Sequence, residues 1–261
     1  MAPGAWWVNS KEAATRANSK LLQLKIATQC GMIIPTTLCS NDPKDIRYFL
    51  LKYEEEGVIY KSLCANFWFE ENKIKIAYTS KINFLDLPRN KLLQLVPGIF
   101  QREVKKKYEL RITCFGDYIV AAKLNSQRHP EGKIDWRAIP EGKMSIEPYK
   151  LPIELENKIR EFMQTLGIVF GAFDFIVTPE GDYVFLEVNE QGQFLWLEEY
   201  SSSFPMLDIF TNFLINKSKA FRWDPNQFNH AINDYRKEME NIVTQNMQHH
   251  VDLNCKRVHN E

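Results

Sequence analysis

The stretch from Gly171 to Asn189 constrains the fold most, because it predicts a β-hairpin with charged groups inside an apolar sequence. Two apolar runs flank a Pro-Glu-Gly-Asp segment, which is typical of a tight turn. Counting outward from a four-residue loop pairs Thr178 with Tyr183. The same count places Asp174 opposite Glu187, so two carboxylates are expected to face each other on neighbouring strands.

Asn189 adds a third oxygen to this face. It lies two residues beyond Glu187, and alternate residues of a strand point to the same side. Ile176 and Phe185 are predicted on the same face as Asp174, nearer the turn. The opposite face is predicted to be wholly apolar and to comprise Phe173, Phe175, Val177, Val184, Leu186 and Val188.

The facing carboxylates suggest a cation. Like charges directly opposite each other destabilise a sheet, and burying them is costly. A hard divalent cation with oxygen ligands removes that cost, and magnesium that carries nucleotide phosphates is a common example. The alternative is that Asp174 and Glu187 lie at an exposed edge of the sheet.

Composition excludes several classes of function. The chain has 261 residues, and its 33 Lys and Arg balance its 33 Asp and Glu, so no overall field attracts nucleic acid or an anionic membrane. No apolar run is long enough to span a bilayer, and the N-terminus does not resemble a signal peptide. The cysteines are odd in number and lack CxxC spacing, which predicts reduced thiols in a cytoplasmic protein without a zinc site. They are Cys30, Cys39, Cys64, Cys114 and Cys255.

The periodicity of apolar residues and the positions of residues that end helices and strands predict an α+β fold. The predicted helices cover residues 11–30, 43–53, 153–166 and 205–217, with Gly31 ending the first. The predicted extended segments cover residues 32–38, 58–61, 99–104, 110–115 and 118–123. Residues 125–149 are polar and rich in Pro and Gly, so we expect a loop over the site.

The tail from Trp223 to Glu261 predicts a helix with a narrow apolar stripe. Its apolar residues are spaced 4, 3, 4 and 3 apart, as in a helix that packs on one partner. Docking on the protein's own domain and contact with a second copy are both consistent with the stripe. It comprises Phe228, Ile232, Tyr235, Met239 and Ile242.

A nucleotide site needs cations for phosphates and polar groups for the base. Lys61 ends a short apolar strand, where a lysine is rare without a charged partner. Lys20 precedes a leucine-rich stretch of a helix, although it could also lie on a solvated face. Backbone groups of the strand containing Gln101, Glu103 and Val104 could meet an adenine edge.

Further residues could contact ribose, phosphate and substrate. Glu109 and Arg111 lie two apart on a predicted strand and therefore share one face. A carboxylate can accept hydrogen bonds from ribose hydroxyls, and a guanidinium can bind phosphate in a forked geometry. Arg128 and Arg137 flank the Pro-Gly loop and could hold an anionic acyl group.

In order and spacing these residues resemble the ATP-grasp ligases. Within them, the chain looks like the peptide-maturing branch, the microviridin-type or graspetide macrocyclases, which crosslink side chains of ribosomal precursor peptides. The resemblance covers about residues 8–215, and its last two motifs are the most specific. The motifs are Lys20-Leu-Leu-Gln-Leu, Ile34-Pro-Thr-Thr, Tyr60-Lys-Ser, Pro97-Gly-Ile-Phe-Gln101, Glu109-Leu-Arg-Ile-Thr, Asp135-Trp-Arg137 and Phe185-Leu-Glu-Val-Asn-Glu-Gln-Gly-Gln-Phe194.

The resemblance implies an α+β fold in which two subdomains with antiparallel sheets bind ATP and Mg²⁺ between them. It divides the chain into an N-terminal linker helix, a small subdomain, a C-terminal subdomain with the magnesium site, and a helical tail. These parts are residues 1–31, 32–105, 106–221 and 222–261.

The resemblance also implies a reaction and roles for residues. A carboxylate of a precursor peptide attacks the γ-phosphate of ATP, and a hydroxyl or amine then displaces phosphate to form an ester or amide. Asp174, Glu187 and Asn189 would hold magnesium. The other roles are phosphate binding by Lys20 and Lys61, adenosine binding by Gln101, Glu103, Val104 and Glu109, and charge stabilisation by Arg111, Arg128 and Arg137.

Two departures from the family pattern leave alternatives open. ATP-grasp enzymes usually carry an N-terminal domain of roughly a hundred residues, whereas 19 residues precede Lys20 here. A natural short form, a trimmed form, or a second copy or partner protein that supplies the domain would account for this. The segment after Lys61 also lacks the glycines of many phosphate-binding loops. A ligase that adds amino acids or glutamate to a protein, and a non-catalytic ATP-binding regulator, therefore remain alternatives.

Overall fold

The structure is a computed structural model that describes residues 4–63, 67–70, 73–76, 79–227 and 229–247. Cys64, Phe228 and Cys255 lie outside these residues. The chain divides into two compact units, Met1–Ile34 with Lys105–Asp234, and Pro35–Val104 with Tyr235–Glu261. We call them unit 1 and unit 2. Both combine helices with antiparallel strands, which confirms the predicted α+β class.

Unit 2 contains a four-stranded antiparallel sheet with the order β1-β6-β2-β5. Its strands are β1 (Thr37–Ser40), β2 (Val58–Ser62), β5 (Ser80–Ile82) and β6 (Gly98–Arg102). A separate hairpin joins β3 (Phe67–Glu70) to β4 (Lys73–Ile76). The short helices η1 (Phe84–Asp86) and α4 (Asn90–Leu93) connect β5 to β6.

Helix α3 (Pro43–Lys52) packs on the unit 2 sheet. It begins as the sequence predicts, with Asp42 as the capping residue and proline in the first turn. The Asp42 carboxylate accepts a hydrogen bond of 2.7 Å from the Lys44 backbone amide. The buried core beneath α3 comprises Ile46, Phe49, Leu50, Val58 and Phe100.

Unit 1 is built on a five-stranded antiparallel sheet with the order β11-β10-β7-β8-β9. Its strands are β7 (Tyr108–Phe115), β8 (Tyr118–Leu124), β9 (Ile146–Pro148), β10 (Phe170–Val177) and β11 (Tyr183–Asn189). The β7–β8 turn is tight, because Gly116 adopts a φ of +58° and a side chain there would meet the Lys219 carbonyl. Strand β11 forms one edge of the sheet.

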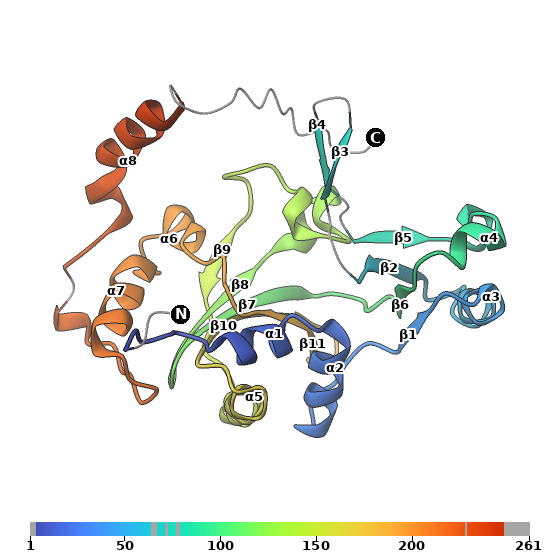
Figure 1. Cartoon of the computed structure of the whole chain (residues 1–261), viewed down its shortest axis with the longest axis horizontal. Coiled ribbons are helices and arrows are strands. Elements are labelled where there is room, and N and C mark those ends of the chain that lie inside the picture. The colour runs from blue at the N-terminus through green and yellow to red at the C-terminus, as the bar shows by residue number, and fades with distance from the viewer. Residues whose placement is uncertain (1–3, 64–66, 71–72, 77–78, 228, 248–261) are drawn as a thin grey trace. The chain divides into compact units, whose positions relative to one another are not determined.

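Helices cover both faces of this sheet (Figure 1). Helices α1 (Lys11–Ala17), α2 (Lys20–Gln29) and α5 (Ile153–Leu166) pack on one face, where Ile112, Phe162, Phe173 and Phe185 are fully buried. Helices α6 (Trp196–Tyr200) and α7 (Met206–Asn216) pack on the other, around Phe115, Phe170, Phe194 and Phe213.

The prediction of one helix over residues 11–30 is wrong. The helix is interrupted at Asn18 and Ser19, and a second helix begins at Lys20. Ser19 is the cap of α2, and its hydroxyl accepts a hydrogen bond from the Leu22 amide. Serine and asparagine favour helix ends, because their short side chains bond to backbone groups. The break makes Lys20 the first residue of α2.

The 171–189 hairpin forms, and Asp174 pairs with Glu187 as predicted. The strand register predicted between this pair and the turn is wrong. Tyr183 pairs with Val177 instead of Thr178, and Phe175 pairs with Phe185. The register shifts between Asp174 and Phe175, so Leu186 is an extra residue in a β-bulge.

The bulge also changes which side chains enter the core. Phe185 was expected on the face of the carboxylates, but it is fully buried among Phe162, Phe173 and Phe175 on the opposite face. Leu186 was expected in that core, but it is only half-buried. One inserted residue reverses the alternation of side chains and accounts for both differences.

The 125–149 segment is largely irregular, as predicted, but it contains short elements. These are η2 (Ser126–Arg128), η3 (Pro130–Gly132), η4 (Trp136–Ala138) and strand β9. In the tail, η5 (Pro225–Gln227) precedes helix α8 (Ile232–Met247), in which Ile232 is buried and Tyr235, Met239 and Ile242 are exposed. None of the helices in the described ranges is long and apolar enough to cross a bilayer.

The bulge predicts an unequal response to two neighbouring substitutions. Phe185→Ala should lower the free energy of unfolding by about 3–5 kcal/mol, because a large buried side chain is removed. Leu186→Ala should cost only about 1 kcal/mol, because this side chain is half-buried. Urea unfolding of both variants tests this, and a larger loss for Leu186→Ala would contradict the bulged register.

Candidate functional site

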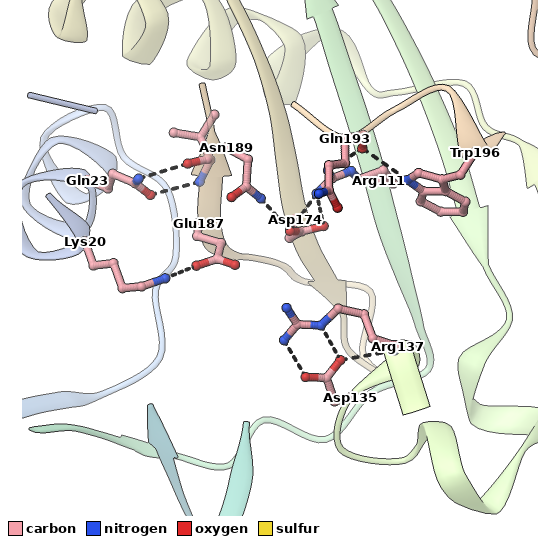
Figure 2. Close-up of polar contacts among 11 residues, drawn as sticks. Lys20, Gln23, Arg111, Asp135, Arg137, Asp174, Glu187, Asn189, Gln193 and Trp196 are labelled. Atoms are coloured by element: carbon pink, nitrogen blue, oxygen red, sulfur yellow. Dashed lines mark hydrogen bonds and ion pairs between the residues drawn. The ribbon is translucent and has the colours of Figure 1, made fainter. Parts of the chain in front are cut away.

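Three oxygen-bearing side chains meet at the end of the β10–β11 hairpin (Figure 2). Asp174 and Glu187 are direct partners across the two strands, and Asn189 pairs with Ala172. The Asn189 amide nitrogen lies 3.5 Å from a carboxylate oxygen of Asp174. The structure therefore brings together the three predicted metal ligands.

Arg111 projects from β7 toward Asp174, its partner in the sheet register. One guanidinium nitrogen donates to both oxygens of Asp174, at 2.9 and 2.8 Å. The other terminal nitrogen donates to the Gln193 carbonyl at 2.7 Å, and the Trp196 indole donates to the same carbonyl at 3.1 Å. Arg111 is thus a buried cation that connects β10 to the segment after β11.

Lys20 forms an ion pair with Glu187 from the opposite side (Figure 2). As the first residue of α2, it lies where that helix approaches β11. The two carboxylates of the hairpin thus have separate cationic partners, Arg111 for Asp174 and Lys20 for Glu187.

Burial raises the pKa of the Asp174 carboxyl, and the negative charge of Glu187 adds to the rise, while Arg111 opposes it. The negative charge of Glu187 therefore adds to the cost of burying an ionised Asp174, although Arg111 opposes it more strongly. Two carboxylates and an amide oxygen match the ligands preferred by a hard divalent cation, whose charge would offset this cost. Within the described residues, no cluster of three or more His, Cys, Asp or Glu side chains could hold a metal. A third oxygen ligand beside the two carboxylates would therefore have to come from a side chain such as Asn189.

Arg137 lies below the carboxylates and is held by Asp135 (Figure 2). Its guanidinium donates two hydrogen bonds to the Asp135 carboxylate, at 2.8 and 2.5 Å. Burial opposes ionisation of Asp135, but the Arg137 contacts hold the pKa of this carboxyl below its usual value. The pKa of Arg137 is raised mainly by the hydrogen bond to Asp135, and further by Glu187 and Asp174. Arg137 therefore belongs to the same electrostatic group.

Glu109 shares a face of β7 with Arg111, as predicted, but it is buried in a polar cluster. One carboxylate oxygen accepts hydrogen bonds from Lys106 at 3.0 Å and from the Ser126 hydroxyl at 2.8 Å. Lys106 also donates to the Ile134 carbonyl at 2.7 Å, so it ties the 126–137 segment to β7. No signal in the sequence pointed to Lys106, because it is the middle residue of the Lys105-Lys106-Lys107 run and the burial of Glu109 is visible only in the structure.

Arg128 is exposed at the end of η2 and lies in a different part of unit 1. It lines a pocket of 250 Å³ that shares no lining residue with the Asp174 group. The pocket is lined by Lys107, Tyr108, Lys123, Asn125, Gln127 and Arg128.

The remaining candidates belong to unit 2. Lys61 lies on β2 opposite Ile99 of β6. Gln101 is buried on β6 and donates a hydrogen bond of 2.9 Å to the Thr37 hydroxyl.

Glu103 and Val104 follow directly after β6. The Glu103 backbone amide donates to the Gly57 carbonyl at 2.9 Å, and its carboxylate lies 2.7 Å from the Lys81 ammonium group. The four unit 2 candidates thus lie on or just beyond two neighbouring strands.

The buried Glu109 predicts a pH dependence of stability. Burial raises the pKa of Glu109, and Lys106 and Ser126 only partly offset the rise. The folded state then binds the proton more tightly than the unfolded state. The free energy of unfolding therefore falls as pH rises from about 4 toward the raised folded pKa.

Glu109→Gln should flatten this decline, whereas Glu154→Gln, at an exposed site on α5, should not. Urea titrations between pH 4 and 7 measure the slope for each protein. An unchanged slope in Glu109→Gln would contradict the burial of an ionisable group at this position.

Comparison with known proteins places these features in a family. No protein-family model matches the chain, and no curated protein sequence matches it. Among solved structures, the macrocyclase MdnC of Microcystis aeruginosa MRC, bound with the precursor peptide MdnA, is 33% identical with a TM-score of 0.72. The match covers 83% of this chain and 66% of MdnC.

Two further solved structures are also similar to this chain. A RiPP-associated ATP-grasp ligase of Chryseobacterium gregarium, in complex with ADP and a leader and core peptide, is 30% identical with a TM-score of 0.75, over 85% of this chain and 67% of that chain. The macrocyclase MdnB of Microcystis aeruginosa MRC is 31% identical with a TM-score of 0.63, over 84% and 64%.

This chain thus spans about two thirds of the length of these structures. The matches confirm the ATP-grasp fold predicted from the motifs. By sequence identity, by fold and by the motifs that build its carboxylate site, this chain belongs to the RiPP-associated ATP-grasp ligases, the family of the graspetide macrocyclases.

Proposed function

We propose that this protein is an ATP-dependent, ADP-forming ligase that crosslinks side chains of a peptide. The observation that carries the proposal is the grouping of Asp174, Glu187 and Asn189 beside the cations Lys20 and Arg111. Such a group of oxygens and cations suits a metal-bound polyphosphate, and the family membership identifies the nucleotide as ATP.

Asp174, Glu187 and Asn189 would hold Mg²⁺. When bound, the metal would supply positive charge that neutralises the phosphates of the nucleotide. Lys20 has a flexible four-carbon stem, so it can exchange its contact with Glu187 for a contact with a phosphate. Lys61 would also bind a phosphate.

The remaining nucleotide contacts follow from the same assignment. Backbone groups at Glu103 and Val104, and the neighbouring Gln101, would meet adenine, while Glu109 would meet ribose. Glu109 already accepts hydrogen bonds from Lys106 and Ser126 through one carboxylate oxygen, so its second oxygen is the one proposed for a ribose hydroxyl.

The reaction would proceed in two displacements. A carboxylate oxygen of the peptide attacks the γ-phosphorus of ATP, and the bond to the leaving ADP oxygen breaks. A hydroxyl or amine of the peptide then attacks the acyl carbon, loses its proton and releases phosphate. The peptide loses one water for each ester or amide formed.

Positively charged side chains would lower the barriers by electrostatics and positioning. Arg111 is buried and fixed at both ends of its guanidinium, so it can stabilise charge on the transferring phosphoryl group without reorganising. Arg137 is held by Asp135 and would do the same for the acyl group. Arg128, which is exposed and lines the separate pocket, would also contribute positive charge for the acyl group.

The substrate assignment rests on relatives. Two of the three structures described above contain precursor, leader or core peptides. We propose that a ribosomal precursor peptide supplies both the carboxylate and its nucleophile, and that the reaction takes place in the cytoplasm, where ATP is abundant.

Product analysis tests the proposed reaction. The protein, ATP and Mg²⁺ are incubated with a candidate precursor peptide that is encoded nearby and rich in Thr, Ser, Glu and Asp. We expect one ADP per bond and the loss of one water per bond by mass spectrometry. Formation of AMP and pyrophosphate would contradict an acyl-phosphate route, and single amino-acid additions would favour a ligase of a different substrate class.

Substitutions test the site. Glu187→Gln and Asn189→Ala should each lower the rate of ADP formation at least about 100-fold, because each removes a proposed metal ligand. Circular dichroism and the melting temperature should remain close to those of the wild type, since both side chains are only half-buried. Near-normal turnover in either variant would show that the metal assignment is wrong.

A further inference from the structure

The outer edge of β11 is covered by an amide side chain from α2. Gln23 donates from its side-chain nitrogen to the Val188 carbonyl at 2.9 Å, and its side-chain oxygen accepts from the Val188 amide at 2.9 Å (Figure 2). The same nitrogen donates to the Ala17 carbonyl at 2.6 Å. Gln23 is only 3% exposed, so these bonds are shielded from water. At Val188 a single side chain therefore supplies the bonds that a neighbouring strand would make, while nearer the turn the Ile33 carbonyl accepts a bond of 2.8 Å from the Phe185 amide.

A second amide holds the residue that follows the strand. The Asn9 side-chain nitrogen donates to the carbonyls of Glu190 and Phe170, both at 2.9 Å. Its oxygen accepts from the backbone amides of Val169 and Phe170, at 2.8 and 3.2 Å. Asn9 thus ties the chain beyond β11 to the beginning of β10.

These two amides enclose the proposed metal ligands of β11. Val188 lies between Glu187 and Asn189, and Glu190 follows Asn189 directly. The direction of a strand side chain is set by the orientation of its own peptide groups. Fixing the backbone at positions 188 and 190 therefore fixes the direction in which Glu187 and Asn189 point.

Gln23 has a second effect, because it lies one helical turn after Lys20. The bonds from Gln23 to Val188 hold the start of α2 against β11. They thereby place the Lys20 ammonium group at Glu187. The same contact sets both a proposed metal ligand and the cation beside it.

We infer that Gln23 and Asn9 are positioning residues of the metal–nucleotide site, a role that rests on the proposed function. They act through the backbone of β11 and touch neither metal nor nucleotide. Outer partners of this kind usually contribute 10–100-fold to metal affinity, because they restrict the orientation of the ligands. A purely structural role would instead lower stability and leave the affinity of the folded protein unchanged.

Gln23→Met tests this inference, because methionine has a similar length but cannot bond to Val188. The matched control is Gln29→Met, which changes the same residue type at an exposed position of α2. Mn²⁺ replaces Mg²⁺ as a hard, oxygen-preferring probe. Its binding in the presence of ADP is followed by loss of the free-ion electron paramagnetic resonance signal.

We expect wild type and Gln29→Met to bind Mn²⁺ with equal affinity and Gln23→Met to bind about 10–100-fold more weakly. Asn9→Leu should weaken binding in the same direction. Met163→Ala, a substitution in the core beneath α5, controls for lost stability and should bind like the wild type at a temperature where it is folded.

Should Gln23→Met fail to fold, Gln23→Asn replaces it. This variant keeps the uncharged amide, but its side chain is one methylene shorter and cannot reach both backbone groups of Val188, so weaker Mn²⁺ binding is again expected. Wild-type affinity in the folded Gln23 variants would overturn the inference. Failure of the wild type to bind Mn²⁺ with ADP would instead overturn the proposed function.

Discussion

The pairing of Asp174 with Glu187 across β10 and β11 is the constraint on which the proposed site depends. The two carboxylates are direct partners on neighbouring strands, with an apolar core on the other face of the sheet. Arg111, on the neighbouring strand β7, balances the negative charge of Asp174, and Lys20, on helix α2, balances that of Glu187. Burial nevertheless keeps the pKa of Asp174 raised, so the site still favours additional positive charge.

Buried polar contacts hold the surrounding segments in place. Lys106 joins Glu109 to the Ile134 carbonyl, and this bond fixes the segment that carries Asp135 and Arg137. Arg111 and Trp196 share the Gln193 carbonyl and fix the segment after β11. Because such groups are costly to leave unpaired, they restrict this side of the site to few arrangements. Electrostatic catalysis requires this kind of preorganisation.

The loop that follows β11 also depends on a glycine. Gly192 has a φ of +50°, and an added side-chain carbon would come within 2.8 Å of the Phe170 ring. The motif after Asn189 is therefore shaped by packing as well as by chemistry.

Local patterns predicted much of the fold and the central part of the site. The hairpin and helix α5 follow from periodicity and turn residues, whereas the pairing of Asp174 with Glu187 was predicted from a turn count whose error the bulge at Leu186 offsets. The bulge at Leu186 was not predictable, because no turn or glycine marks it, and it moved Phe185 into the core. The break at Ser19 was missed because apolar residues continue past it on a helical period.

Long-range polar partners were beyond sequence reasoning. Asn9 bonds to Phe170 and Glu190, and Gln23 bonds to Val188, over separations of 161, 181 and 165 residues. In the sequence, each amide resembles an ordinary helix or loop residue. Only the fold shows that its side chain bonds to the backbone at or next to the edge strand. Gln23 lay within a motif that resembled the family, but the motif did not reveal what its side chain contacts.

The most direct test of the central claim is calorimetric titration of the protein with ADP, with and without Mg²⁺. If the paired carboxylates bind a metal that carries the nucleotide, Mg²⁺ should strengthen ADP binding in the wild type. The same addition should have little effect in Glu187→Gln. Equal ADP affinity of the wild type with and without Mg²⁺ would contradict the account.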